Sequence, residues 1–195
     1  MKIFLFIDGT NLYSAQYELF GSNKYLIFPK FIKEVEKKIK IKFDQIYFYA
    51  SYSPQPNRPT IKEKHYLKNE ALFYRSVKQT KNLFFFTGYR SKTSGKEKEV
   101  DVKLAVDIVD FAHQNKYDEV FLISGDADFM EALKVSQRIG KYTSVICIEN
   151  KIMFKSLLFF KTYIIKFTNK AINIYKIRKR PFFVSIDKNE VTKRI

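Results

Sequence analysis

Short apolar runs alternate with amphipathic stretches along most of the chain. Continuous apolar runs are typical of strands buried on both faces, so we predict strands at residues 3–7, 45–51, 82–89, 119–124, 142–148 and 163–168. Apolar residues recur at helical spacing in between, which predicts helices at residues 11–20, 30–40, 60–80, 101–114, 128–139 and 151–160. This alternation predicts an α/β fold with a mainly parallel sheet covered by helices.

The stretch 101–114 has the clearest helical pattern. Leu104, Ala105 and Ile108 recur on one stripe, which we expect to face the core. Asp101 lies on the same stripe, so we expect it on the core side of the first turn. A second stripe is polar and is expected to be solvated; it contains Lys103, Asp107, Asp110 and Gln114.

Loops and the end of the chain are marked by composition. Residues 53–59 contain three prolines in seven positions, and residues 90–99 are polar and basic. From about residue 170 the sequence is basic and irregular. We therefore predict one domain over residues 1–168 and a basic C-terminal tail over residues 169–195.

The net charge of the chain limits the classes of partner that it is expected to bind. Its 195 residues suffice for one domain, and 36 Lys and Arg against 20 Asp and Glu give a net charge of +16. Such an excess favours nucleic acid first and an anionic membrane surface second, although an AT-rich genome produces the same bias. The single cysteine, Cys147, lies in an apolar run and is interpreted as a core residue.

Nothing in the apolar stretches predicts export or a membrane anchor. The N-terminal apolar run ends at Asp8, which is too early for a signal peptide. Lys155 and Lys161 interrupt the most apolar long stretch before it reaches a membrane-spanning length. We therefore expect a cytoplasmic protein with no membrane contact.

Aspartates follow the predicted strands. Asp8 comes directly after the first strand, Asp126 and Asp128 follow the strand at 119–124, and Asp101 opens a helix. Sites in parallel sheets gather at the carboxyl ends of the strands, so Asp8, Asp101 and Asp126 are expected to meet there. Crowded carboxylates are costly without a counter-charge. A hard cation such as Mg²⁺ or Mn²⁺ removes that cost and can activate water, which makes a metal site our interpretation.

Each aspartate also has a simpler interpretation. Asp128 with Glu131 has the spacing of a capping box, so Asp128 could cap its own helix. Asp101 could simply interact favourably with the helix dipole at the N-terminus of its helix, and Asp8 could be a turn residue. His65 and His113 have no suitably spaced partner, so we assign them no metal or catalytic role.

Two familiar motifs are excluded because the chain lacks residues that they require. The segment FIDGTN is similar to the haloacid-dehalogenase signature, but Phe6 stands where that family has its nucleophilic aspartate. The segment SGDADF lacks the glycines and the lysine of a phosphate-binding loop. A phosphatase-like or nucleotide-binding enzyme is therefore disfavoured.

Three blocks in order resemble the NYN domain, in its LabA-like branch of the PIN-like nucleases. They read FIDGTNLY, KEKEVDVKLAVDIVDFA and DEVFLISGDADFMEALKVSQRIGKYTSVI, and the resemblance covers roughly residues 1–168. It implies a PIN-like three-layer sandwich and a metal-dependent nuclease site, with RNA as the usual substrate. The family's acidic positions match Asp8, Asp101 and Asp126, with Asp128 in the third block.

The resemblance also assigns polar positions. The family's polar residue after the first strand matches Asn11, the serine before the acidic pair matches Ser124, and the lysine before the helical aspartate matches Lys98. Two positions depart from the family pattern. Glu99 stands where the family often has glycine, and Lys161 stands where many relatives have an acidic residue near the last strand.

Two functions remain open. In the first, the chain is a Mg²⁺- or Mn²⁺-dependent ribonuclease: Asp8, Asp101 and Asp126 hold the metal, Asp128 completes the cluster, and Asn11 and Ser124 orient a ligand or a phosphate. The expected partner is single-stranded RNA, contacted by Arg90, Lys92, Lys96 and Lys98, with Tyr13 as a base-stacking candidate or a core residue. In the second, the chain is a non-catalytic or regulatory nucleic-acid-binding module. A homo-oligomer is compatible with either.

Overall fold

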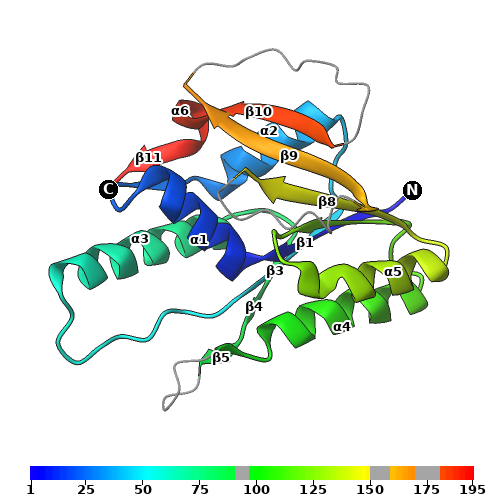
Figure 1. The fold of residues 1–195 in the computed structure, drawn as a ribbon, viewed down its shortest axis with the longest axis horizontal. Coiled ribbons are helices and arrows are strands. Elements are labelled where there is room, and N and C mark those ends of the chain that lie inside the picture. The colour runs from blue at the N-terminus through cyan, green and yellow to red at the C-terminus, as the bar shows by residue number, and fades with distance from the viewer. Residues whose placement is uncertain (91–96, 150–158, 170–180) are drawn as a thin grey trace.

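A seven-stranded sheet forms the centre of the protein (Figure 1). The computed structural model describes residues 1–90, 97–149, 159–169 and 181–195. The strand order is β10-β9-β8-β7-β1-β3-β4, and all neighbouring pairs are parallel. The strands are β1 (Ile3–Asp8), β3 (Gln45–Ala50), β4 (Leu83–Thr87), β7 (Glu119–Ile123), β8 (Tyr142–Ile148), β9 (Lys161–Thr168) and β10 (Phe182–Asp187).

Helices cover both faces of this sheet, which makes three layers. One core contains side chains of α1 (Gly9–Phe20), α2 (Phe28–Ile39) and α3 (Ile61–Lys78). The other contains side chains of α4 (Val100–His113) and α5 (Met130–Arg138), which follows the 3₁₀ turn η1 (Ala127–Phe129). The predicted α/β fold with a mainly parallel sheet is confirmed. None of the described helices is both long and apolar enough to cross a bilayer.

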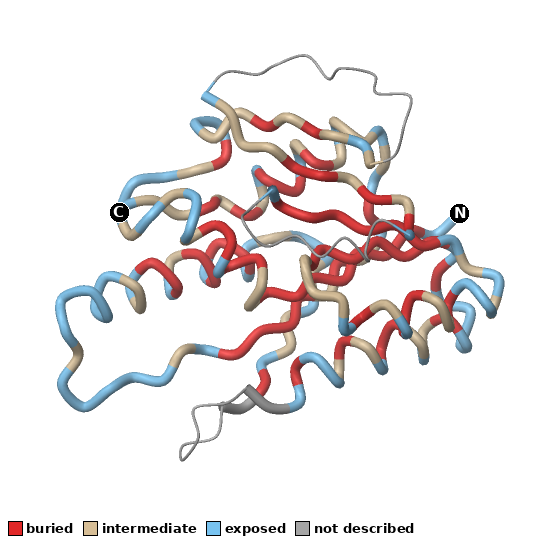
Figure 2. The backbone as a smooth tube through the Cα atoms, in the orientation of Figure 1, coloured by how far each residue is buried: buried red, intermediate tan, exposed pale blue. Residues whose placement is uncertain are grey.

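The central strands are buried on both sides. Along β1, Ile3, Leu5 and Ile7 belong to the first core, while Phe4 and Phe6 belong to the second. Figure 2 shows this burial concentrated in the middle of the sheet and on the inner sides of the helices. Apolar residues at every position are therefore required here, which explains why the strand carries no polar alternation.

The end of the chain differs from the sequence prediction. An irregular tail is wrong for residues 181–195, because β10 extends the central sheet and β11 (Thr192–Arg194) pairs antiparallel with β2 (Lys24–Leu26). The short helix α6 (Lys188–Val191) joins them. Phe182–Asp187 buries Val184 and Ile186 against residues far away in sequence. The helix predicted at 151–160 lies outside the described residues except for its last two positions.

The helix α4 buries Leu104 and Ile108 as predicted, but the prediction that Asp101 lies on the core side is wrong. Its buried stripe contains Val100, Leu104 and Ile108, whereas Asp101 is exposed. Asp107, predicted to be solvated, is buried. The reason is tertiary: the Tyr49 hydroxyl donates a 2.7 Å hydrogen bond to Asp107, and Lys103 donates a second one, so the carboxylate is tolerated inside.

The strand order places a topological switch point between β1 and β7. From β1 the chain proceeds to β3 and β4 on one side, and from β7 to β8, β9 and β10 on the other. The connection from β1 to β3 contains α1 and α2, on one face; the connection from β7 to β8 contains α5, on the opposite face. In open α/β sheets, ligands bind in the crevice at the carboxyl ends of such strands.

Candidate active site

Asp8 is held at the point where β1 becomes α1. It is 5% exposed, and its Oδ1 accepts a 2.9 Å hydrogen bond from the backbone N–H of Asn11, so it caps α1. The next residue must be glycine: a Cβ on Gly9 would lie 2.2 Å from the Phe48 ring and 2.8 Å from the Tyr49 carbonyl oxygen. Gly9 therefore lets α1 begin directly against β3.

The loop after β7 is joined to Asp8 across the switch point. The buried Ser124 hydroxyl donates a 3.0 Å hydrogen bond to Asp8 Oδ2 and accepts one of 3.0 Å from the N–H of Asp126. The N–H of Gly125 donates to Asn11 Oδ1, also at 3.0 Å. Two loops from adjacent parallel strands are thereby locked together. We call the residues Asp8, Asn11, Ser124, Gly125 and Asp126 the β1–β7 crevice.

Asp126 caps the turn that follows the crevice. Its Oδ1 accepts a 3.0 Å hydrogen bond from the N–H of Asp128, and its side chain is half-buried. On the other side, the Cys147 thiol lies 3.2 Å from the Ser124 carbonyl oxygen. Burial raises the pKa of Cys147 to about 12, so the thiol stays protonated. Cys147 is a buried core residue, as predicted, and supports the crevice from β8.

Asp128 is exposed, and the proposed capping box with Glu131 is wrong. Phe129 occupies the N-cap of α5 and makes no side-chain cap, and Glu131 instead pairs with Lys134 at 2.6 Å. The capping role falls to Asp126, one turn earlier, because a 3₁₀ turn precedes α5.

The three predicted metal ligands do not form one cluster. Among the residues that the structure describes, no group of three or more histidine, cysteine, aspartate or glutamate side chains is arranged to hold a metal ion. Asp8 and Asp126 are linked through Ser124, but Asp101 is exposed at the first turn of α4. The phase of α4 explains the difference, since Val100 faces the core in place of Asp101.

The side-chain oxygens of the crevice still suit Mg²⁺ or Mn²⁺, in a site with fewer protein ligands than predicted. Asp8 and Asp126 offer carboxylate oxygens and Asn11 an amide oxygen, and oxygen ligands are those that these hard cations accept. Mg²⁺ is commonly bound by one or two carboxylates plus waters and substrate phosphates. A recess of about 10 Å³ beside Asn11, Ser124 and Gly125 is otherwise lined by apolar side chains and includes neither Asp8 nor Asp126, so it is not the position of a metal.

Tyr13 is a core residue and not a base-stacking platform. Its side chain is 1% exposed, and its hydroxyl donates a 3.0 Å hydrogen bond to the Tyr66 carbonyl oxygen. Burial raises its pKa well above the ordinary value of tyrosine. The ring packs against Phe73 and Tyr66, so neither face is open to a base.

The predicted basic loop is only partly described. Arg90 and Lys98 belong to the two-stranded β5–β6 pair, formed by β5 (Tyr89–Arg90) and β6 (Glu97–Lys98). Lys92 and Lys96 lie outside the described residues. Their contact with RNA stays a prediction.

Lys161 lies at the amino end of its strand, whereas the crevice lies at the carboxyl ends of the strands. It is the first residue of β9 and pairs with Ser144, near the start of β8, whereas the crevice follows the ends of β1 and β7. Lys161 lines a pocket of about 510 Å³ together with Glu119 and Tyr142, at the amino ends of the strands. Lys161 therefore does not substitute for an acidic residue of the crevice, and the largest pocket described is not the candidate site.

The loop 53–59 and the helix 60–80 were predicted, but no site was assigned between α3 and this loop. Glu70 is 3% exposed and accepts hydrogen bonds from the Ser53 hydroxyl at 2.8 Å and the Ser53 N–H at 3.1 Å. A pocket of about 290 Å³ lies between this loop and α3, near Pro54, Tyr66 and Leu67. The available signal was the position of Glu70 on the same helical stripe as the buried residues Phe73, Tyr74 and Val77.

Fold and crevice together define a doubly wound α/β protein with acidic and polar side chains at its switch point. The NYN domain matches residues 2–168, so the chain belongs to the NYN domain family. That family is part of the PIN-like nuclease superfamily, whose fold is of a nuclease type.

Comparison with solved structures supports the fold beyond residue 168. The crystal structure of a protein of unknown function, VPA0982 from Vibrio parahaemolyticus RIMD 2210633, is similar to the chain with a TM-score of 0.55 and 19% sequence identity. The match covers 98% of this chain and 96% of that one, so it includes most of the C-terminal elements. The search of curated protein sequences gave no match.

Proposed function

We propose that the chain is a metal-dependent ribonuclease of the LabA-like branch, acting on RNA in the cytoplasm at the β1–β7 crevice. The observation that carries the proposal is the hydrogen-bonded link from Asp8 through Ser124 to Asp126, which joins two acidic residues across the switch point. The membership of the NYN family and the net charge of +16 support RNA as the substrate.

Asp8 and Asp126 would hold Mg²⁺ or Mn²⁺, and the exposed Asp101 would contact the metal's waters from α4. When bound, such a cation activates water and offsets charge on a phosphodiester. Ser124 keeps the Asp8 carboxylate oriented, and Asn11 fixes the β7 loop through Gly125. Asp128, at the surface beside Asp126, would orient water at the entrance.

Cleavage of a labelled single-stranded RNA, with and without Mg²⁺ or Mn²⁺, tests the proposal. Wild type should cut only with metal. The substitution Asp126→Asn keeps the side chain's size but removes its charge, so cleavage should fall by orders of magnitude at an unchanged melting temperature. Asp110→Asn, an exposed position of α4, is the matched control and should cut like wild type. Metal-independent cleavage would refute the proposal.

A second function has one specific observation in its favour. No three-carboxylate cluster exists among the described residues, and the oxygens of Asp8 already accept hydrogen bonds that cap α1 and bind Ser124. A regulatory RNA-binding module needs only those structural roles. Salt-sensitive RNA binding by a wild type that never cuts, with any divalent metal, would favour this alternative.

A further inference from the structure

The loop 51–60 begins at the carboxyl end of β3, on the same side of the sheet where the crevice lies at the carboxyl ends of β1 and β7, and it leads into α3. The loop starts at the end of β3, and Tyr49 of β3 is the register partner of Asp8. Figure 1 shows the loop running outward along α3 and turning back into its N-terminus. We call these residues, 51–78, the α3 arm. Its base therefore lies one strand away from Asp8.

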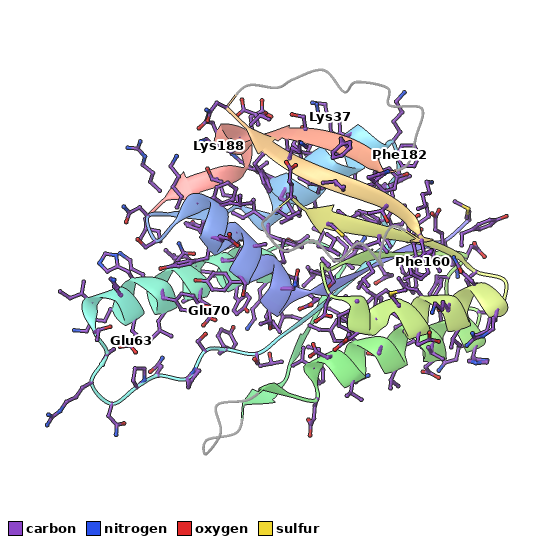
Figure 3. The ribbon with its side chains drawn as sticks, viewed as in Figure 1. Lys37, Glu63, Glu70, Phe160, Phe182 and Lys188 are labelled. Atoms are coloured by element: carbon purple, nitrogen blue, oxygen red, sulfur yellow. The ribbon has the colours of Figure 1, made fainter. Side chains whose placement is uncertain are left out.

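The arm is fixed by buried and capped groups. Glu70 holds Ser53 at the base, and the Tyr52 ring packs edge-on against Tyr74, with centroids 5.1 Å apart. At the tip, Thr60 and Glu63 form a capping box at the start of α3. Figure 3 labels Glu63 and Glu70 on the side of α3 that faces the loop. The prolines of the loop further restrict its backbone.

The pocket in this arm has the properties of a base-binding site. Its volume of about 290 Å³ is lined by the apolar side chains of Pro54, Pro56, Tyr66 and Leu67 and by the polar residues Ser53, Gln55 and Glu63. Flat apolar walls accept the face of a base, and an amide can donate to and accept from a base edge. Only an unstacked base can enter such a pocket, which favours a single strand over a duplex.

The outer side of α3 carries unpaired positive charge beside the pocket. Lys64, Lys68 and Arg75 are exposed at helical spacing, and Lys64 and Lys68 directly follow the pocket residues Glu63 and Leu67 in sequence. Within the described parts of the chain, none of these three cations forms an ion pair. Both acidic residues of α3, Glu63 and Glu70, are on the loop side and bonded there. This cationic ridge is complementary to a phosphate backbone.

We infer that the α3 arm is a substrate-binding subsite that receives one unpaired base of single-stranded RNA in the pocket and its phosphates on the ridge. The inference rests on the proposed function, since it supplies the RNA that the crevice would cut. It assigns RNA contacts to described residues of α3, in addition to the predicted β5–β6 loop.

Binding experiments in EDTA separate this subsite from catalysis. Fluorescence anisotropy compares a short single-stranded RNA with a duplex of the same length. Wild type should prefer the single strand by about tenfold, the range of one bound base. Leu67→Trp fills the pocket from the helix and Gln55→Trp from the exposed loop, so a folding defect in one does not remove the test. Each should abolish the preference while duplex binding is unchanged.

The ridge is tested by a charge-matched pair of double variants. Lys64→Ser/Lys68→Ser should weaken binding and reduce the slope of log affinity against log salt by about 1.4, or about 0.7 per phosphate contact. Lys30→Ser/Lys33→Ser, at exposed positions of α2, removes the same charge and should leave the slope unchanged.

The outcomes distinguish the two proposals. Equal affinity for single strand and duplex, a preference that survives both tryptophan variants, or equal slopes for the two double variants would overturn the subsite. A retained subsite in a wild type that never cleaves RNA would refute the proposed ribonuclease and leave the inference standing.

Discussion

The β1–β7 crevice and the start of α4 both carry aspartates that sequence patterns assign to one site, but the two regions are built differently. In the crevice, the Asp8 and Asp126 carboxylates accept hydrogen bonds from backbone N–H groups three and two residues ahead, and the Ser124 hydroxyl links Asp8, 116 residues away, to the N–H of Asp126. On α4, Val100 and not Asp101 is buried at the first turn, and Asp107 is buried with a hydrogen bond from Tyr49, 58 residues away. The caps made by Asp8 and Asp126 are local and can be predicted from sequence, whereas the burial of Asp107 depends on a distant partner and cannot.

The largest effect expected from this difference is on RNA cleavage. Asp126→Asn should reduce cleavage by orders of magnitude, because Asp126 would hold the metal. Asp101→Asn should reduce it by only about 10- to 100-fold, the range for groups that support a metal's ligands indirectly. Single-turnover rates at saturating Mn²⁺ measure both. Equal losses would show that Asp101 joins the crevice directly and would break the contrast.

The anchor of α4 is the next test. Tyr49→Phe removes the hydroxyl that bonds to buried Asp107, and it should lower the free energy of unfolding by about 1.5–3 kcal/mol, as for a hydrogen bond to a charged group. Urea denaturation near pH 8 measures the loss. An unchanged stability would mean that Lys103 alone suffices to hold Asp107.

The same variant has a defined pH dependence. Burial, with the hydrogen bond to Asp107, raises the pKa of Tyr49 above its ordinary value near 10. Above pH about 10 the unfolded chain loses the Tyr49 proton and the folded chain keeps it, so this one group lowers the stability of wild type by about 1.4 kcal/mol per pH unit. Since phenylalanine does not titrate, the stabilities of wild type and Tyr49→Phe should converge as pH rises above 10.

The Ser124 link inside the crevice is expected to contribute somewhat less to the free energy of unfolding than the Tyr49–Asp107 hydrogen bond. Ser124→Ala leaves the N–H of Asp126 and one oxygen of Asp8 without this buried partner, at a cost of about 1–3 kcal/mol. Cleavage should fall as well, because Asp8 loses an orienting bond. Ser14→Ala, at an exposed position of α1, is the control. A Ser124→Ala protein as stable and active as wild type would remove the link from the account.

The smallest effect concerns the start of α4. Glu99 has φ 76°, in the left-handed region that favours glycine, and this is the position where the NYN family often has glycine. Glu99→Gly should change the free energy of unfolding by less than about 1 kcal/mol, towards higher stability, since relief of strain exceeds the added chain entropy. Glu99→Ala keeps the strain and should show no gain in the same thermal melts.

Sequence patterns predicted the parallel sheet and the position of the crevice because both depend on local features. Apolar runs mark β1 and β7, and Asp8, Ser124 and Asp126 follow them directly. The strand β10 was missed because a basic stretch separates it from its partner β9, and the short apolar run at 182–187 was therefore assigned to a basic tail. The pocket of the α3 arm was missed because it requires Glu70 to reach Ser53, a contact that spacing alone does not reveal.

The most direct test of the central claim, that the β1–β7 crevice is a metal site, is a crystal structure of the protein soaked in Mn²⁺ with anomalous diffraction recorded. The account predicts an anomalous peak within coordination distance of Asp8 and Asp126, and no peak there in crystals of Asp126→Asn. A crevice without a peak at saturating Mn²⁺, in wild-type crystals that show Mn²⁺ bound elsewhere, would contradict it.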